Sequence, residues 1–276
     1  MTLPNFLVIG AAKGGTTSLH HYLRQHPEVY LTPVKETNFF WSEAREEGRQ
    51  TVQTLAGYER LFADARAAKA IGEVSPRYLN SAGAAERIRQ TLPDVRLVVS
   101  LRHPAERAWS DYLGRLRILR ESRPFDEAVQ PGEPCLEWGF YFPRLQRYFD
   151  RFPRGQIHVI LHDDLTRDTD AVLRGFFTFL GVDARVPIDT STRHNAAALP
   201  HSRWLNAVLW NSILVAEHAV PRRWRGSGIA AAVLEKTYRR APKLPADVRA
   251  RLCALYRDDV LATSELIGRD LTRWLT

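Results

Sequence analysis

A short apolar run, Phe6–Ile9, leads into the glycine-rich segment 10–15 and then into three hydroxyl-bearing residues at positions 16–18. The apolar run is far too short to span a membrane and is typical of a buried strand. We expect a helix over residues 16–25, because Pro27 disfavours helical backbone at the residue before it. The chain therefore opens with a strand, a tight loop and a helix.

Two further runs rich in β-branched residues, Arg96–Leu101 and Ile157–Leu161, have the composition of strands that are covered on both faces. Shorter strands are expected at Val29–Leu31 and Ala70–Glu73. The segments between the strands have helical spacing, and the last of them ends at Gly181, a residue suited to a helix C-terminus. The helices that we expect are 58–68, Pro104–Leu119, Phe140–Phe152 and Asp170–Leu180.

This alternation predicts a doubly wound α/β fold, with a mostly parallel central sheet flanked by helices and ligands at the carboxyl ends of the strands. Beyond about Pro187 the pattern changes to helices separated by prolines and rich in arginine. We expect a single domain over residues 1–276, with a core at about 5–185 and a helical, arginine-rich C-terminal extension at about 187–276.

The net charge of +8 is concentrated near the C-terminus. Residues 1–200 carry 26 Lys and Arg against 24 Asp and Glu, so the remaining 76 residues hold a net charge of +6. A basic segment can bind nucleic acid, but this one lacks the interleaved aromatic and basic residues of a stacking surface. We therefore keep nucleic-acid binding as an alternative and expect no nucleic-acid partner.

The glycine-rich loop has the chemistry of a phosphate site. A strand, a Gly-Gly pair and a helix start turn backbone N–H groups and the helix dipole toward one point, and Lys13 adds a positive charge there. The simpler interpretation is a tight turn and nothing more. Nucleoside triphosphatases end this loop with Gly-Lys-Ser/Thr, whereas Lys13 precedes the glycine pair.

A second anion site is expected where the strand Arg96–Leu101 ends. Arg102 follows the strand directly, where its guanidinium can pair with a phosphate, and Ser110 offers a hydroxyl on the next helix. An arginine at a strand end is commonly only an ion-pair partner. Two anion sites on neighbouring strand–helix units nevertheless indicate a doubly phosphorylated nucleotide.

Together these two segments resemble the donor site of the sulfotransferases that use 3′-phosphoadenosine-5′-phosphosulfate (PAPS). The loop Lys13–Ser18 is similar to the family's 5′-phosphosulfate loop, and Arg102–Tyr112 is similar to its 3′-phosphate motif. The resemblance is to the branch that contains heparan sulfate sulfotransferases and bacterial relatives. It extends over Lys35–Phe40, Gly72–Pro76, Gly139–Tyr141 and the strand before Asp163.

The resemblance implies a P-loop-like sulfotransferase fold and transfer of a sulfuryl group from PAPS to the hydroxyl of a small-molecule or glycan acceptor, with no metal required. It implies catalytic roles for Lys13, which would stabilise the leaving oxygen, and for Glu36, the base, with Glu73 in reserve. Lys35, Phe39 and Phe40 would contact the acceptor. The residues that would bind the donor are Lys13, Gly14, Gly15, Thr16, Thr17, Ser18, Arg102 and Ser110.

Several residues near these motifs leave alternatives open. Val74 stands where the heparan sulfate enzymes carry a lysine, so the resemblance does not name the acceptor. Tryptophans such as Trp41 and Trp138 are expected in an acceptor pocket or in the core. The segment Arg193–Asn195 is a further candidate for the 3′-phosphate. His20, His21 and His26, near the loop in sequence, are expected at the surface.

The main alternative activity is that of a P-loop kinase that uses Mg-ATP, with Asp163 and Asp164 after an apolar strand as metal ligands. The position of Lys13 argues against it. The two cysteines, Cys135 and Cys253, have no metal-ligand spacing and form no disulfide framework, which favours a reducing compartment. With no transmembrane segment and no targeting signal evident in the sequence, we expect a cytoplasmic protein.

Overall fold

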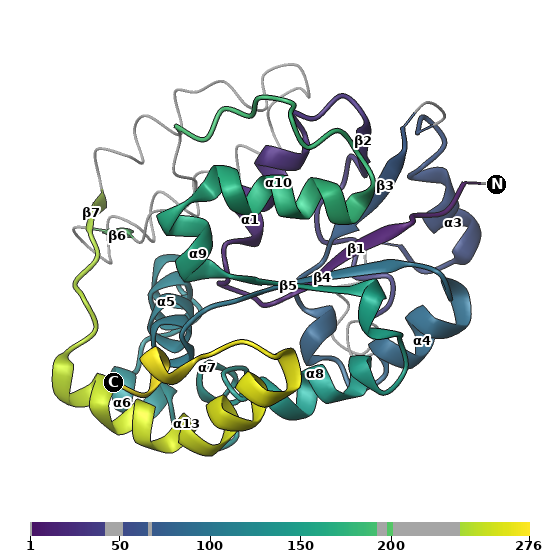
Figure 1. The fold of residues 1–276 in the computed structure, drawn as a ribbon. Helices are drawn as coiled ribbons and strands as arrows, with labels where there is room; N and C mark the ends of the chain where they lie inside the picture. Colours follow the sequence, from purple (N-terminus) through teal and green to yellow (C-terminus); the bar gives the residue numbers. More distant parts are fainter. Residues whose placement is uncertain (1, 42–51, 66–67, 192–197, 201–237) are drawn as a thin grey trace, which may run out of the picture.

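The structure is a computed structural model that describes residues 2–41, 52–65, 68–191, 198–200 and 238–276. Its centre is a sheet of five strands, all paired in parallel, in the order β2-β3-β1-β4-β5 (Figure 1). The predicted α/β class with a parallel central sheet is confirmed. The strands are β1 (Phe6–Gly10), β2 (Val29–Leu31), β3 (Ala70–Val74), β4 (Arg96–Leu101) and β5 (Ile157–Leu161).

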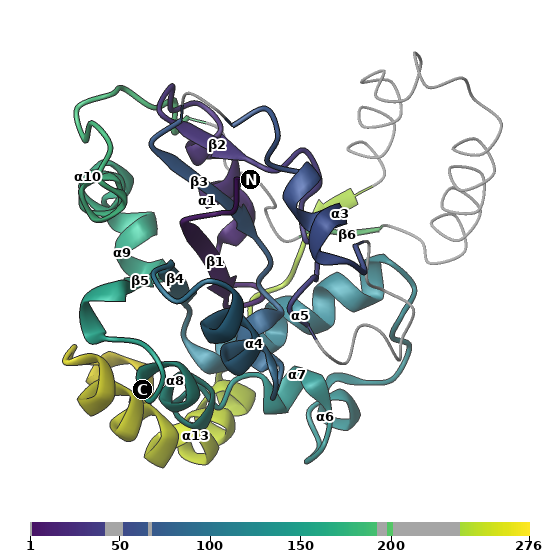
Figure 2. The ribbon, with the colours of Figure 1, turned by 90° about the vertical axis from the view of Figure 1, so that its right-hand side faces the viewer.

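Successive residues of β1 pack on opposite faces of the sheet, because side chains alternate along a strand. Phe6 and Val8 join a core with α1 (Thr16–Leu23) and α10 (Thr169–Leu180). Leu7 and Ile9 join the larger core on the other face. Figures 1 and 2 show the two helical layers on either side of the sheet. The helices of the second layer include α4 (Ala84–Thr91), α5 (Pro104–Arg117), α8 (Phe142–Phe149) and α13 (Ala246–Ile267).

The remaining elements are short. A turn of 3-10 helix at Tyr78–Asn80 follows β3, and another at Thr272–Leu275 ends the chain. Among the helices of the described part of the chain, none is long and apolar enough to cross a bilayer. The short helices are α3 (Leu55–Arg60), α6 (Phe125–Ala128), α7 (Pro134–Glu137) and α9 (His162–Arg167).

The predicted C-terminal extension contains the helix α13, as expected, and also an element that the sequence does not predict. This element is a short antiparallel pair, β6 (Ala198–Pro200) and β7 (Tyr238–Arg240). A strand of three residues is too short to show a recognisable alternation of apolar and polar residues in the sequence. Helix α3 begins earlier than the predicted 58–68, because Thr54 caps its start by accepting from Gly57 N at 3.1 Å, and it ends at Arg60.

Helix α13 packs against α5 and α8, and it fixes where α8 begins. Asp259 of α13 accepts hydrogen bonds from the backbone N–H groups of Tyr141 and Phe142, at 2.7 and 3.0 Å. These N–H groups belong to the start of a helix, where no intrahelical partner is available. The helix therefore covers Phe142–Phe149, less than the predicted 140–152.

Strand β1 lies between β3 and β4: the chain first builds β2 and β3 on one side of β1, and then crosses to its other side to build β4 and β5. In open parallel sheets this switch point leaves a crevice at the carboxyl ends of the strands. The glycine-rich loop follows β1 there, and Arg102 and His162 follow β4 and β5. The fold thus brings three segments that are far apart in the sequence to the same edge of the sheet.

Candidate functional site

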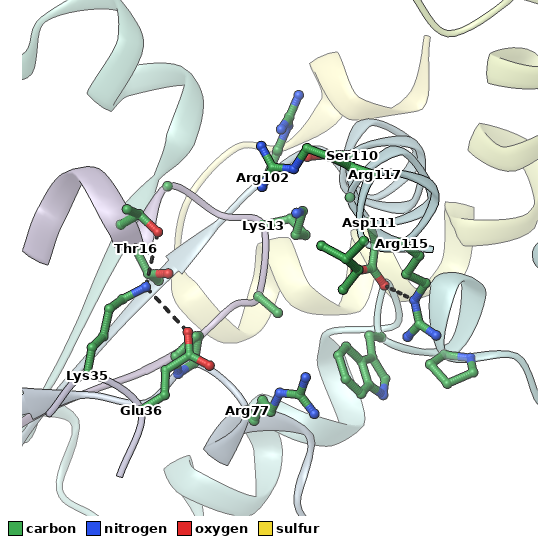
Figure 3. A pocket seen from close by; sticks show the side chains of 18 of the residues that line it. Lys13, Thr16, Lys35, Glu36, Arg77, Arg102, Ser110, Asp111, Arg115 and Arg117 are labelled. Carbon is green, nitrogen blue, oxygen red and sulfur yellow. Dashed lines mark hydrogen bonds and ion pairs between the residues drawn. The ribbon is translucent and has the colours of Figure 1, made fainter. Parts of the chain in front are cut away.

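A pocket of about 570 Å³ opens at this edge of the sheet (Figure 3). One wall is the loop after β1 with the first turn of α1, and a second is the exposed face of α5. The third wall comes from the segments that follow β2 and β3. The predicted residues Lys13, Gly15, Thr16, Thr17, Ser18, Lys35, Glu36, Arg102 and Ser110 all line it.

Gly14 allows the glycine-rich loop to pack directly against strand β4. A Cβ at this position would lie 2.1 Å from the carbonyl oxygen of Ser100 in β4, so only glycine allows the approach. Ser100 Oγ donates to Gly14 O at 2.6 Å, and Gly14 N donates to Ala11 O at 2.9 Å. Gly14 therefore anchors the loop to β4 and does not itself line the pocket, whereas its neighbours Lys13 and Gly15 do.

Lys13 extends from the loop toward α5. Its backbone has φ of 72°, the left-handed region that non-glycine residues seldom adopt. Gly114 of α5 leaves room for the ammonium, since a Cβ there would be 2.6 Å from Lys13 Nζ. Burial lowers the pKa of Lys13, while the carboxylate of Asp111 acts in the opposite direction. The protein thus holds a partly desolvated cation in the pocket.

Arg102 and Ser110 lie next to each other on the side of the pocket where α5 begins (Figure 3). Arg102 NH2 is 3.6 Å from Glu106 Oε2, and Glu106 also accepts from Arg249 NH1 at 2.6 Å. Burial lowers the pKa of Arg102, which reflects a guanidinium largely removed from water. The fold brings this predicted pair beside Lys13.

Glu36 faces the pocket with Lys35 beside it. Lys35 Nζ lies 3.3 Å from Glu36 Oε1 and donates to Thr17 Oγ1 at 3.1 Å. The backbone N–H of Glu36 donates to Val74 O at 3.1 Å, which attaches this loop to the end of β3. Glu36 also has a positive φ, of 59°. Such backbone strain tends to occur at functional sites.

Glu73, the reserve base, is fully buried and does not line the pocket. Its carboxylate accepts from Tyr78 OH at 2.7 Å, from Tyr58 OH at 2.9 Å, from Ser75 Oγ at 3.2 Å and from Thr37 Oγ1. Burial raises the pKa of Glu73, and these four donors oppose the rise. The network holds the segment that carries Glu36.

The predicted acceptor residues separate into two groups. Lys35 lines the pocket, whereas Phe39 and Phe40 are in the core and outside the lining. The Phe39 ring stacks on Tyr58 with centroids 4.3 Å apart. From the sequence, Phe39 and Phe40 could face either the core or the pocket. Their packing against Tyr58 places both side chains in the core. Trp41, two residues further on, does line the pocket.

Several pocket residues were not singled out from the sequence for this site, and those with ionisable side chains are Arg77, Asp111, Arg115, Arg117, Arg120 and His162. His162 packs against Gly15, and burial lowers the pKa of its imidazole to about 4. As the first residue after β5, it has the strand-end position that drew attention to Arg102. Arg77, by contrast, carries no signal of its own in the sequence.

Two of the three histidines expected at the surface are buried. His20 is 8% exposed, and burial lowers its pKa to about 4. His26 is 2% exposed, and its ring pairs with the carbonyl oxygen of Asp183 at 2.9 Å. That expectation was wrong for both, and for His26 the reason is packing against Phe177 of α10, with ring centroids 4.6 Å apart. His21 is exposed, as expected.

Asp163 and Asp164 are engaged by the C-terminal end of the chain. Asp163 accepts from Trp274 Nε1 at 2.8 Å, and Asp164 from Arg269 NH2 at 2.7 Å. Neither lines the pocket. Within the described residues, no group of three or more His, Cys, Asp or Glu side chains is arranged to hold a metal ion. The candidate segment Arg193–Asn195 lies outside the described residues.

The charge of the pocket favours anionic ligands. Two acidic residues, Glu36 and Asp111, face a larger set of cations, and low-dielectric walls strengthen such a field. The cationic lining residues are Lys13, Lys35, Arg77, Arg102, Arg115, Arg117 and Arg120.

The chain is similar to known sulfotransferases in both sequence and structure. A family model described as the sulfotransferase family matches residues 4–185. A crystal structure of a sulfotransferase from Alicyclobacillus acidocaldarius superposes with a TM-score of 0.76 at 30% identity, and covers 100% of both chains.

Two curated relatives are similar over part of their length. The membrane-associated sulfotransferase kil1 of Dictyostelium discoideum is 32% identical over 140 residues, which is 51% of this chain and 27% of that protein. The heparan sulfate glucosamine 3-O-sulfotransferase 3B1 of Mus musculus is 29% identical over 189 residues, 65% of this chain and 46% of that protein. This chain thus spans less than half the length of either relative.

Proposed function

Because this chain belongs to the sulfotransferase family, we propose that it transfers a sulfuryl group from PAPS to the hydroxyl of an acceptor. The products are a sulfate ester and adenosine 3′,5′-bisphosphate. The acceptor classes compatible with the family are carbohydrates, lipids and small-molecule alcohols. Of the two curated relatives above, one has heparan sulfate glucosamine in its name and the other names no acceptor, so the family alone does not choose among these classes.

One observation carries the proposal: two anion-binding elements and a carboxylate line one pocket. The loop from Lys13 to Ser18 suits a phosphosulfate group, and Arg102 with Ser110 suits a second phosphate. Glu36 completes the set with a group that can accept a proton. The residues present therefore fit PAPS, a doubly phosphorylated donor.

In this proposal Lys13 and Glu36 carry the chemistry. Bound PAPS supplies the sulfuryl group and a phosphate leaving group. Glu36 takes the proton from the acceptor hydroxyl as its oxygen bonds to sulfur, and Lys35 orients the Glu36 carboxylate. Lys13 stabilises the negative charge that grows on the bridging oxygen as the old S–O bond breaks. Thr16, Thr17 and Ser18 hold the donor's 5′ end by their hydroxyl groups.

The first test is which nucleotide stabilises the protein against heat, since a ligand that binds only the folded state raises the melting temperature. We expect adenosine 3′,5′-bisphosphate to raise it in EDTA. Labelled PAPS should then yield labelled products with a panel of alcohols. Stabilisation by Mg-ATP alone would instead indicate a kinase and would overturn the proposal.

We also propose that the protein works without a metal and in a reducing compartment such as the cytoplasm. The support for the compartment is that Cys135 and Cys253 are both free and buried. Burial raises the pKa of the Cys135 thiol to about 12, so it stays protonated and unreactive in the folded state. Titration of the unfolded protein should give two free thiols, and chelators should not reduce turnover.

A further inference from the structure

Two arginines that are distant in the sequence lie on either side of one carboxylate, that of Glu106 in the first turn of α5. Arg249 NH1, from the first turn of α13, donates to Glu106 Oε1 at 2.6 Å. Arg102 NH2 lies 3.6 Å from the other carboxylate oxygen, Oε2, which is close enough for an ion pair but too far for a hydrogen bond. Glu106 is therefore hydrogen-bonded to Arg249 and only weakly paired with Arg102.

The position of Arg249 is fixed by the packing of α13 against α5 (Figure 1). Its Nε donates to the backbone oxygen of Thr276 at 3.1 Å, so a second contact orients the guanidinium. Cys253, one turn further along α13, has its Sγ 3.8 Å from Nε2 of His103, the residue that caps the start of α5. Arg249 and Glu106 therefore face each other across a packed contact between two helices.

This contact adjoins the donor site from outside the pocket. Arg102 lines the pocket, whereas Glu106 and Arg249 do not. Arg249 can therefore influence a bound ligand through Glu106 and Arg102 without touching it. Arg249 also lies outside residues 4–185, the part of the chain that the family model matches. The contact thus joins the matched segment to the C-terminal helix that follows it.

The charge on Glu106 affects how strongly Arg102 can bind an anion. A phosphate on Arg102 would lie close to the Glu106 carboxylate, and like charges repel each other in a partly buried site. An unpaired Glu106 would also compete with the phosphate for the N–H groups of Arg102. Arg249 opposes both effects, because it neutralises the carboxylate and holds Oε1 at hydrogen-bond distance. Both side chains are about one-third exposed, so water screens the effect in part.

We propose that Arg249 is a positioning residue for the donor: by binding Glu106 it keeps this carboxylate from pairing with Arg102, and so strengthens the preference for nucleotides with a 3′-phosphate. The inference rests on the proposed function, because it takes Arg102 to bind the 3′-phosphate of PAPS. It gives helix α13 a part in donor selectivity, although no residue of this helix lines the pocket.

The test compares adenosine 3′,5′-bisphosphate with adenosine 5′-monophosphate, which lacks the 3′-phosphate, by calorimetry. Arg249→Gln should weaken binding of the bisphosphate about fivefold to tenfold and change that of the monophosphate less than about twofold. A merely structural loss would weaken both ligands alike. With PAPS as donor, KM should rise by about the same factor while kcat changes less than about threefold, since the lost effect is remote from the transferred sulfuryl group.

Further variants test whether Arg249 acts through Glu106. In a Glu106→Gln background, Arg249→Gln should alter bisphosphate affinity less than about twofold, because no carboxylate is left to neutralise. Arg249→Lys keeps the charge and should stay within about threefold of wild type. The matched control is Arg251→Gln, which removes an arginine of the same helix that pairs with Asp126; neither of these two residues lines the pocket. It removes the same charge and should leave both affinities unchanged.

The outcomes separate the two proposals. If wild type binds the bisphosphate but Arg249→Gln weakens both nucleotides equally, or neither, the inference is overturned and the proposed function stands. The same conclusion holds if the selective loss persists in the Glu106→Gln background. If wild type does not bind the bisphosphate, both proposals fall. Should Arg249→Gln fail to fold, Arg249→Met, which keeps an apolar stem and lacks the charge, has the same expected result.

Discussion

The Nζ atom of Lys35 lies 3.3 Å from Oε1 of Glu36. The same ammonium donates to Thr17 at 3.1 Å, so a single cation joins the proposed base to the first turn of the helix that follows the glycine-rich loop. Both Lys35 and Glu36 are about one-third exposed, which leaves the carboxylate accessible to an incoming hydroxyl. This arrangement leads to the first prediction.

Replacing Glu36 by Gln should reduce kcat about 100-fold or more, because the amide cannot accept the acceptor's proton. Affinity for adenosine 3′,5′-bisphosphate, measured by calorimetry, should stay within about threefold of wild type. Lys35→Ala should weaken both turnover and nucleotide affinity, since it removes the link to Thr17. Full turnover by Glu36→Gln would exclude this residue as the base.

Glu73→Gln should retain turnover within about tenfold, because Glu73 supports the site from the core and does not face the pocket. Glu73→Leu should unfold more easily, by about 3 kcal/mol, since it leaves the buried hydroxyls of Tyr58 and Tyr78 without their acceptor. Urea denaturation and initial rates check the two effects. A larger loss of kcat for Glu73→Gln than for Glu36→Gln would reverse the assignment.

Lys13→Ala should lower kcat by about 100-fold or more while leaving the melting temperature nearly unchanged. Burial lowers the pKa of Lys13 below the ordinary lysine value of 10.5. Turnover should therefore decline at alkaline pH, as the Lys13 ammonium loses its proton. Lys13→Arg, whose side chain stays charged, should retain some turnover and lose this alkaline decline. An unchanged pH profile in Lys13→Arg would contradict the role of Lys13 as the titrating cation.

Gly14→Ala should destabilise the fold by about 1–3 kcal/mol, because the added Cβ meets the backbone oxygen of Ser100. The matched control is Gly175→Ala in α10, where a Cβ meets nothing within 4 Å. That change should stabilise the helix by up to about 1 kcal/mol, the difference in helix propensity. Equal denaturation midpoints for the two variants would contradict the close approach of the loop to β4.

Stability should decrease in mild acid, partly through His103. Burial lowers the pKa of His103 from 6.5 to about 4, and its Nδ1 accepts from Ala105 N at 3.2 Å. Between these two pH values the unfolded chain binds a proton that the folded chain excludes. The free energy of unfolding therefore falls as pH drops through this window, by about 3 kcal/mol at most for this residue.

His103→Asn tests this dependence, because asparagine can also cap α5 but does not titrate. The slope of unfolding free energy against pH between 6.5 and 4 should become shallower. It should not vanish, since burial also lowers the pKa values of His20 and His162 to about 4. An identical slope in wild type and variant would show that His103 is already charged in the folded protein.

Much of this fold and site follows from local sequence. The strands Arg96–Leu101 and Ile157–Leu161 were predicted with the bounds they have, because buried parallel strands are continuous apolar runs. The family was predicted from the resemblance of Lys13–Ser18, Arg102–Tyr112 and shorter segments to known motifs, and the match over residues 4–185 confirms it. These signals are local: each depends on residues close together in the chain.

Tertiary structure decided what depends on distant partners. Ser100 explains why position 14 must be glycine, and Asp259 decides where α8 begins. Arg77 and Trp138 are 61 positions apart, and no pattern in the chain predicts their stacking at one end of the pocket. In the sequence, the family resemblance favours Glu36 as the base and keeps Glu73 in reserve. The two glutamates differ in burial: Glu73 is packed in the core among hydroxyl donors, whereas Glu36 faces the pocket.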